Sequence, residues 1–393
     1  MDLLSIKEIE SKYVMQTYSR EDVLLVKGQG CLLYDDQGNE YIDMTSGIGV
    51  NCLGHNHPKL VEAIQDQAQK LLHCSNIFYS EPMVLVAREL VKATGMSKMF
   101  FANTGAEANE GLIKLARKYS QDHYGKGRYK ILSLVQSFHG RTMMTLTATG
   151  QDKFHHDFDP FPEGFDYVKA NDIASFLEKL DDSLCCVIME MIQGEGGVLP
   201  LEKEFVQTVA KICKERDILV AVDEVQTGIG RTGSLFCYQQ YGIQPNIVSM
   251  AKGLGGGVVI GGFLADQKCS EVLTPGTHGS TFGGNPLSAR AAQTVLSIVN
   301  RPEFLKEVKE KGDYLMDGLK NIASSKIKEV RGMGLMIGVI VDPEQRTQYV
   351  HALRHRGVLV LTAGKDAIRL LPPLIITKEQ IDKAVSAFQE VFK

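Results

Sequence analysis

Residues 219–224 (LVAVDE) form a short apolar run that ends in two carboxylates. Four similar runs occur elsewhere, and helical patterns lie between them, including residues 107–119 and 204–216. Continuous apolar runs of this length are typical of strands buried on both faces. Alternating strands and helices predict an α/β fold with a mostly parallel sheet flanked by helices. The other runs are residues 99–103, 130–135, 185–190 and 246–251.

The last hundred or so residues have a different pattern. Residues 330–341 and 358–362 predict strands of a separate sheet, followed by a final helix. That helix is expected to begin at Thr377, which together with Gln380 has the spacing of a capping box. Its apolar face is predicted to contain Ile381, Ala384, Val385, Phe388 and Phe392.

A domain boundary is expected near Pro286, where the pattern changes. The large domain would then span residues 61–286, and a smaller α+β domain would span residues 287–393. Residues 1–60 would form an N-terminal segment that packs with the small domain. A chain of 393 residues is long enough for this division.

Charge and composition exclude several classes of protein. The 43 basic and 47 acidic side chains give a net charge of −4, which argues against a surface built to bind nucleic acid. No run of about 20 apolar residues is present, so no membrane span is expected. The start of the chain lacks a basic region followed by an apolar block, and the eight cysteines have no framework spacing. These features predict a cytoplasmic protein.

The first motif with chemical potential is residues 103–110 (NTGAEANE), directly after a predicted strand. Thr104 and Glu107 have capping-box spacing, so a helix is expected to begin here. Gly105 and Ala106 would then offer backbone N–H groups at the positive end of that helix, which is a good phosphate site. An ordinary capped helix would have the same pattern.

The second motif is residues 223–226 (DEVQ), at the end of LVAVDE. The carboxyl ends of strands are where α/β sheets place their binding sites. A buried Asp223 needs a cationic partner to stay charged, and the protonated ring nitrogen of a cofactor would be one. The alternative is a structural salt bridge.

The third motif is residues 249–257 (SMAKGLGGG), in which Lys252 ends a predicted strand and precedes a glycine loop. A lysine held at such a position suits a Schiff base with an aldehyde cofactor. The alternative is a surface lysine whose stem covers apolar surface.

Two further patterns resemble known binding motifs, but each lacks an acidic residue that the motif requires. Residues 228–233 (GIGRTG) match the dinucleotide-binding spacing, but no acidic residue stands about 20 positions beyond them, where Gly253 is found. His351 and His355 share a helix face but lack the glutamate of a zinc protease. A metal site is therefore not expected, and a dinucleotide-dependent oxidoreductase is kept as the alternative from another enzyme class.

Taken in order, the motifs resemble those of class III of the pyridoxal-phosphate-dependent aminotransferases, which have fold type I. The resemblance extends over nearly the whole chain and implies pyridoxal 5′-phosphate (PLP) as the cofactor. Further matching motifs are residues 47–55 (GIGVNCLGH), 138–142 (FHGRT), 193–197 (QGEGG), 230–233 (GRTG) and 277–286 (THGSTFGGNP).

The resemblance assigns roles around the cofactor ring. Lys252 would form the Schiff base and later move the proton at the reacting carbon. Asp223 would keep the ring nitrogen protonated, so that the ring accepts electrons. Gln226 would bond to the ring oxygen, and Phe138 would stack on the ring face.

The resemblance also implies a homodimer with shared sites. Gly105 and Ala106 would bind the cofactor phosphate, and Thr281 of the neighbouring subunit would complete that phosphate site. Ser280 is expected to contact the distal end of the amino donor across the same interface.

Substrate roles follow from three charged residues. Arg141 would bind the distant carboxylate of either substrate in a bidentate contact. Arg369 would bind the carboxylate next to the reacting carbon of 2-oxoglutarate, and Glu195 would pair with Arg369 when that carboxylate is absent.

Residues 73–79 (HCSNIFY) are similar to those of family members that act on N2-acetylornithine. This similarity predicts an amino transfer to 2-oxoglutarate that gives N-acetylglutamate 5-semialdehyde and glutamate, as a step towards arginine. Ornithine, 4-aminobutyrate and succinyldiaminopimelate remain alternative amino donors, because contacts far from the catalytic centre decide among them.

Overall fold

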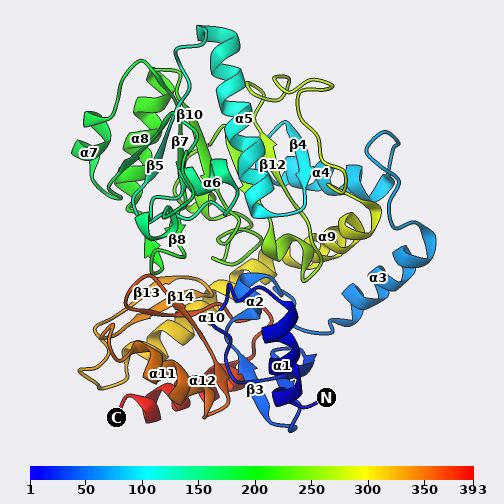
Figure 1. Ribbon diagram of the computed structural model, residues 1–393, viewed down its shortest axis with the longest axis vertical. Helices are drawn as coiled ribbons and strands as arrows, with labels where there is room; N and C mark the ends of the chain where they lie inside the picture. The colour runs from blue at the N-terminus through cyan, green and yellow to red at the C-terminus, as the bar shows by residue number, and fades with distance from the viewer.

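The computed structural model describes all 393 residues, and its largest feature is a seven-stranded sheet (Figure 1). The strand order is β4-β12-β11-β10-β7-β5-β6, and only β12 runs antiparallel to its neighbours. The predicted mostly parallel sheet is therefore confirmed. The strands are β4 (Lys98–Ala102), β5 (Lys130–Leu134), β6 (Phe165–Val168), β7 (Leu184–Met189), β10 (Leu219–Asp223), β11 (Ile247–Met250) and β12 (Gly261–Ala265).

Helices cover both faces of this sheet. Along β10, Leu219 and Ala221 belong to one apolar cluster and Val220 and Val222 to another, because successive side chains point to opposite faces. The first cluster contains the inner face of α5, and the second contains residues of α8, α4 and α9. These helices are α4 (Glu81–Thr94), α5 (Gly105–Tyr124), α8 (Lys203–Glu215) and α9 (Pro286–Val299), with α3 (Pro58–Lys70), α6 (Met143–Ala148) and α7 (Ile173–Glu178) around them.

A second, antiparallel sheet has the order β13-β14-β17-β16. Helices α10 and α12 pack together beside it. The predicted capping box at Thr377 and Gln380 is present, and the predicted face of the last helix is buried except for the half-buried Val385. The elements are α10 (Pro302–Lys320), β13 (Glu329–Met333), β14 (Met336–Ile340), α11 (Arg346–Arg354), β16 (Leu361–Ala363), β17 (Ala367–Leu370) and α12 (Lys378–Val391).

The prediction of one strand over residues 358–362 is wrong, because the segment divides between two sheets. Strand β15 (Val358–Leu359) pairs in parallel with β3, with Val358 opposite Ile42. Strand β16 instead pairs with β17. The chain changes sheets between them, which a continuous apolar pattern does not reveal.

The N-terminal segment lies beside the C-terminal part, at the bottom of Figure 1. Its sheet has the order β1-β2-β3-β15, so its fourth strand comes from the far end of the sequence. The division into domains at residues 60 and 286 stays a prediction. The elements here are α1 (Leu3–Tyr13), β1 (Leu25–Gln29), β2 (Leu32–Asp35), β3 (Glu40–Asp43) and α2 (Ser46–Gly49).

None of the helices of the chain has both the length and the hydropathy to cross a membrane. Several short elements lie between the longer helices and strands. The short elements are β8 (Ile192–Gln193), β9 (Leu199–Pro200) and the 3-10 turns η1 (Asp152–Phe154), η2 (Cys237–Gln240) and η3 (Lys252–Gly255).

Candidate active site

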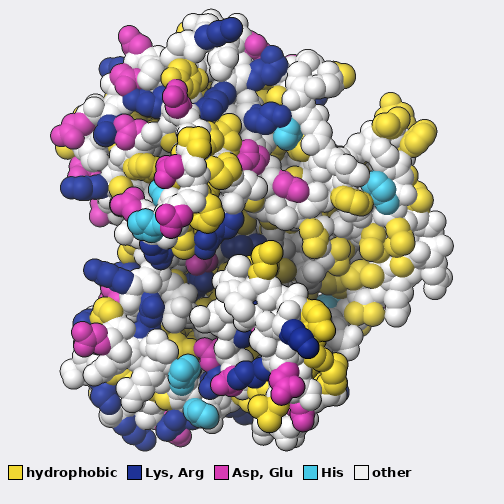
Figure 2. Space-filling view, viewed as in Figure 1, with side chains coloured by type: hydrophobic (Ala, Val, Ile, Leu, Met, Phe, Trp, Pro, Cys, Tyr) yellow, Lys and Arg dark blue, Asp and Glu magenta, His cyan; other side chains and the backbone are white.

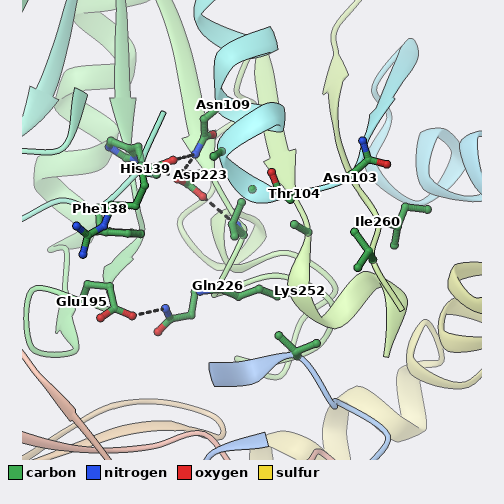
Figure 3. A pocket seen from close by; sticks show the side chains of 18 of the residues that line it. Asn103, Thr104, Asn109, Phe138, His139, Glu195, Asp223, Gln226, Lys252 and Ile260 are labelled. Carbon is green, nitrogen blue, oxygen red and sulfur yellow. Dashed lines mark hydrogen bonds and ion pairs between the residues drawn. The ribbon is translucent and has the colours of Figure 1, made fainter. Parts of the chain in front are cut away.

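A cavity of about 480 Å³ lies at the carboxyl ends of the parallel strands. The loops that follow β4, β5, β7, β10 and β11 all contribute to its wall, as expected for a site in a parallel sheet. Figure 3 shows Lys252, Asp223 and Gln226 facing the same space. The predicted residues that line it are Gly105, Ala106, Phe138, Arg141, Glu195, Asp223, Gln226 and Lys252.

Asp223 is the last residue of β10, and its side chain is buried. Its Oδ2 accepts hydrogen bonds from Asn109 Nδ2 at 2.7 Å and from His139 Nδ1 at 2.8 Å. Its Oδ1 accepts from the backbone N–H of Val225 at 3.0 Å. Three donors therefore fix the orientation of this carboxylate, and no lysine or arginine forms a salt bridge with it in the chain.

Asn109 and His139 were not singled out from the sequence. His139 stands inside the FHGRT motif, and Asn109 lies one helical turn after the proposed phosphate site, so both were within quoted motifs. His139 is also fixed from its other side, since its Nε2 lies 3.2 Å from Ser133 Oγ. Their role is visible only when α5, the β5 loop and β10 are brought together.

Glu190 is a second buried carboxyl group that the sequence reasoning missed. Glu190 directly follows β7, and Asp223 is the last residue of β10. The similar position of the two carboxyl groups at a strand end could have identified Glu190 from the sequence. Its two oxygens accept from the backbone N–H groups of Phe138 at 2.8 Å and Gly194 at 3.2 Å. Burial raises the pKa of Glu190 to about 7. Glu190 thus joins the loop that carries Phe138 to the loop that carries Glu195.

Lys252 begins the turn η3, two residues after the end of β11, so the expectation that it ends the strand is slightly wrong. Its φ of 44° lies in the left-handed region, which is strained for a side chain other than glycine. Burial lowers the pKa of its ammonium group, and the Glu195 carboxylate opposes that shift. A lowered pKa leaves more of the neutral amine, which is the nucleophilic form.

Glu195 pairs with Arg369, on β17. Glu195 Oε1 lies 2.5 Å from Arg369 Nη1, and Gln226 Oε1 accepts from the same nitrogen at 3.1 Å. Burial alone would raise the pKa of Glu195, but the Arg369 charge lowers it overall. Arg369 is 2% exposed, so it is not a surface ion pair. Arg369 does not line the cavity itself. It contacts Glu195 and Gln226, and both of these residues line the cavity.

The helix start at α5 differs in one detail from the predicted capping box. Thr104 Oγ1 accepts from the backbone N–H of Glu107 at 3.1 Å, as expected. The Glu107 carboxylate, however, accepts from the backbone N–H of Asn103 at 2.6 Å and not from Thr104. The N–H groups of Gly105 and Ala106, in the first turn, have no intrahelical partner. A Cβ at Gly105 would lie 2.7 Å from the Val225 side chain, so the close approach there requires glycine.

Ser280 and Thr281 do not line the cavity of their own chain. Thr281 is exposed. Ser280 Oγ accepts from Asn103 Nδ2 at 3.3 Å and from the backbone N–H of Gly283 at 3.0 Å. Asn103 does line the cavity, so Ser280 lies just outside its wall. The contacts predicted for both residues with a neighbouring subunit stay predictions.

The GIGRTG segment packs against other parts of the same chain. A Cβ at Gly230 would lie 2.6 Å from the Val299 side chain. Arg231 is buried and donates to the backbone carbonyls of Leu335 at 2.9 Å and Pro372 at 2.5 Å. The segment therefore connects the β10 loop to the C-terminal part of the chain, which favours a structural role over dinucleotide binding.

The donor set of the cavity fits PLP. The buried amine of Lys252 suits an imine, the Asp223 carboxylate suits a protonated ring nitrogen, and the free N–H groups at the start of α5 suit a phosphate. All three groups border one cavity of about 480 Å³.

Comparisons with known proteins agree with this arrangement and confirm the resemblance seen in the motifs. Residues 14–392 match the family described as aminotransferase class-III. The chain is 49% identical to the acetylornithine aminotransferase of Haemophilus ducreyi, over 98% of each chain. It is 48% identical to that of Caldanaerobacter subterraneus subsp. tengcongensis, over 97% of this chain and 98% of the relative.

A solved structure shows the same fold. The ornithine aminotransferase of Toxoplasma gondii, which has partial occupancy of PLP at its active site, has a TM-score of 0.95 and 30% identity. The match covers 99% of this chain and 94% of that one. The chain therefore belongs to the class-III aminotransferase family.

Proposed function

We propose that this protein transfers the δ-amino group of N2-acetylornithine to 2-oxoglutarate, which yields N-acetylglutamate 5-semialdehyde and glutamate. Family membership makes it a PLP-dependent transaminase. The substrate is inferred from curated relatives named acetylornithine aminotransferase at 43–49% identity. The observation that carries the proposal is that Glu195, which lines the cavity, pairs with the buried Arg369, whereas Arg141, which also lines the cavity, has no anionic partner.

The residues that would hold the cofactor are those of the donor set. Lys252 would bind it covalently, and the backbone of Gly105 and Ala106 would bind its phosphate. Asp223 would face the ring nitrogen, and Phe138 would cover one ring face. When bound, PLP supplies an electron sink for the carbanion at the reacting carbon.

The protein's own groups would then carry the proton transfers and the orientation. Once displaced by the amino substrate, the Lys252 amine is free to remove the proton from the reacting carbon and return it. Its lowered pKa keeps a larger fraction of that amine neutral. Asn109 and His139 hold Asp223 in one orientation, so its charge is in place before the reaction begins.

The two substrates differ in charge near the reacting carbon. The δ-carbon of N2-acetylornithine bears no carboxylate, so a free Arg369 would be an uncompensated buried charge. Glu195 supplies the missing negative charge. Because 2-oxoglutarate brings its own carboxylate to this position, it would displace Glu195 from Arg369. Arg141 would bind the distant carboxylate in both half-reactions.

We also propose a homodimer with shared sites. Four large apolar side chains before α4 and next to Thr281 are exposed, and Figure 2 shows hydrophobic side chains gathered on the side that carries α4 and α9. Exposed apolar clusters of this kind mark association surfaces. A partner there would bring Thr281 and Ser280 to a second cavity. The four side chains are Ile77, Phe78, Tyr79 and Phe282, which are 85%, 67%, 99% and 59% exposed.

A panel of amino donors against 2-oxoglutarate tests the proposed substrate. We expect the highest kcat/KM for N2-acetylornithine, followed by ornithine, 4-aminobutyrate and succinyldiaminopimelate in any order. A higher kcat/KM for one of the other three would replace the proposed donor. No turnover with any ω-amine would contradict the proposed function altogether.

A further inference from the structure

The guanidinium of Arg141 is held by aromatic rings and not by an anion. Its Cζ lies 4.0 Å from the ring centre of Phe154 and 5.6 Å from that of Phe138. Arg141 lines the cavity and is exposed, and none of the salt bridges of the chain includes it. Its donor groups are therefore available to a ligand.

Phe154 connects this arginine to the predicted cofactor site. It is the last residue of η1, and its backbone N–H donates to the carbonyl of Gln151 at 3.0 Å. Its ring meets that of Phe138 edge to face, with centres 5.7 Å apart and an angle of 77°. One side chain thus contacts both Arg141 and the ring proposed to cover the cofactor.

An aromatic face orients a guanidinium without using its hydrogen-bond donors. The donors of arginine lie in the plane of the guanidinium, whereas a cation–π contact is made through the face of the ring. A carboxylate neighbour would instead occupy the same donors that a substrate carboxylate needs. Arg369 is held in this second way, by Glu195.

We propose that Phe154 is a positioning residue that directs Arg141 towards the distal carboxylate of the substrate. The inference rests on the proposed function, because it requires that Arg141 binds this carboxylate. It explains why the two arginines are held differently. Arg369 must be released and recaptured between half-reactions, whereas Arg141 stays available in both.

The test compares Phe154→Leu, which removes the aromatic face, with Phe154→Tyr, which keeps it. We expect Phe154→Leu to raise KM for both N2-acetylornithine and glutamate roughly fivefold to tenfold, with kcat within about twofold of the parent. Phe154→Tyr should restore KM. Phe158→Leu is the matched control, since Phe158 lies in the same loop and is 54% exposed.

A binding measurement avoids dependence on turnover. N-acetyl-L-norvaline is N2-acetylornithine without its δ-amino group, and titration calorimetry on the PLP-loaded enzyme gives its Kd. We expect Phe154→Leu to weaken this binding by the same factor as it raises KM, with the visible spectrum unchanged. In an Arg141→Gln background the substitution should have no further effect, because Phe154 acts through Arg141.

Two results would overturn the inference. One is an unchanged Kd and KM in Phe154→Leu, and the other is an equal loss in Phe154→Tyr. If Phe154→Leu unfolds, Phe154→Met replaces it under the same criteria. A parent enzyme that turns over another ω-amine but not N2-acetylornithine would contradict the proposed substrate alone, since the glutamate arm would still report on Phe154.

Discussion

Glu195 Oε1 and Arg369 Nη1 lie 2.5 Å apart, although 174 positions separate the two residues in the sequence. Glu195 is on the loop after β8, and Arg369 is on β17 of the second sheet. Arg369 is 2% exposed, so Glu195 compensates a buried positive charge. The contact joins the loop after β8 to the second sheet beside the cavity, and the proposed exchange of substrates depends on it.

Glu195→Ala should damage the two half-reactions unequally. Without Glu195, Arg369 is free to attract the only carboxylate of N2-acetylornithine and so misplace its δ-amino group. We expect the half-reaction with N2-acetylornithine to slow roughly a hundredfold. The half-reaction with glutamate, which brings its own carboxylate, should slow much less.

Single-turnover measurements of each half-reaction, with Glu204→Ala on the exposed face of α8 as control, check this expectation. Equal losses in both halves would rule out the exchange of partners at Arg369.

Asp223→Asn should reduce the rate of both half-reactions. In either orientation the amide nitrogen would face an existing donor, since Oδ2 accepts from Asn109 and His139 and Oδ1 accepts from the backbone N–H of Val225. We expect a loss of at least roughly a hundredfold in the single-turnover rate, because the amide also lacks the charge. A rate within tenfold of the parent would show that this carboxylate is not the electrostatic partner of the cofactor.

Glu224→Gln should change the pH dependence of stability. Glu224 is fully buried, and burial raises its pKa to about 7, whereas an unfolded glutamate has a pKa of about 4.3. The folded protein therefore binds this proton more tightly, and its stability falls as the pH rises from about 5 through 7. The amide oxygen would still accept from the backbone N–H of Tyr238. Thr227 Oγ1 donates to Glu224 in the parent, and it would instead accept from the amide nitrogen, without the titration.

Urea unfolding midpoints at pH 5 and pH 8 measure this effect. The free energy of unfolding of the variant minus that of the parent should be more positive at pH 8 than at pH 5. The Glu190 carboxyl titrates in both proteins, so the difference isolates Glu224. A stability difference that is constant with pH, or that shrinks as the pH rises, would contradict the raised pKa.

Five of the seven strands of the large sheet were predictable because each coincides with a short apolar run, whereas β6 and β12 were not predicted. The five predicted strands match observed strands to within one residue at each end, since each apolar run stops where the sheet stops. Asp223 and Lys252 were predictable for the same reason, because the ends of those runs locate the binding edge.

The rest of the site depends on contacts between distant segments. Asp223 is 84 positions from His139 and 114 from Asn109, and no local pattern encodes those distances. Phe154 lies in a loop with no motif, and only the fold brings its ring to Arg141. The division of residues 358–362 between two sheets likewise depends on which partner strands are near, since the pattern of apolar residues is the same for either.

Every role proposed for the cavity requires an imine between Lys252 and the cofactor, and borohydride trapping detects that bond. The purified holoenzyme is reduced with borohydride, digested and analysed by peptide mass spectrometry, with Lys252→Ala as the matched control. We expect a phosphopyridoxyl group on the peptide that contains Lys252, and no such group in the variant. A label on another lysine, or none on the parent protein, would contradict it.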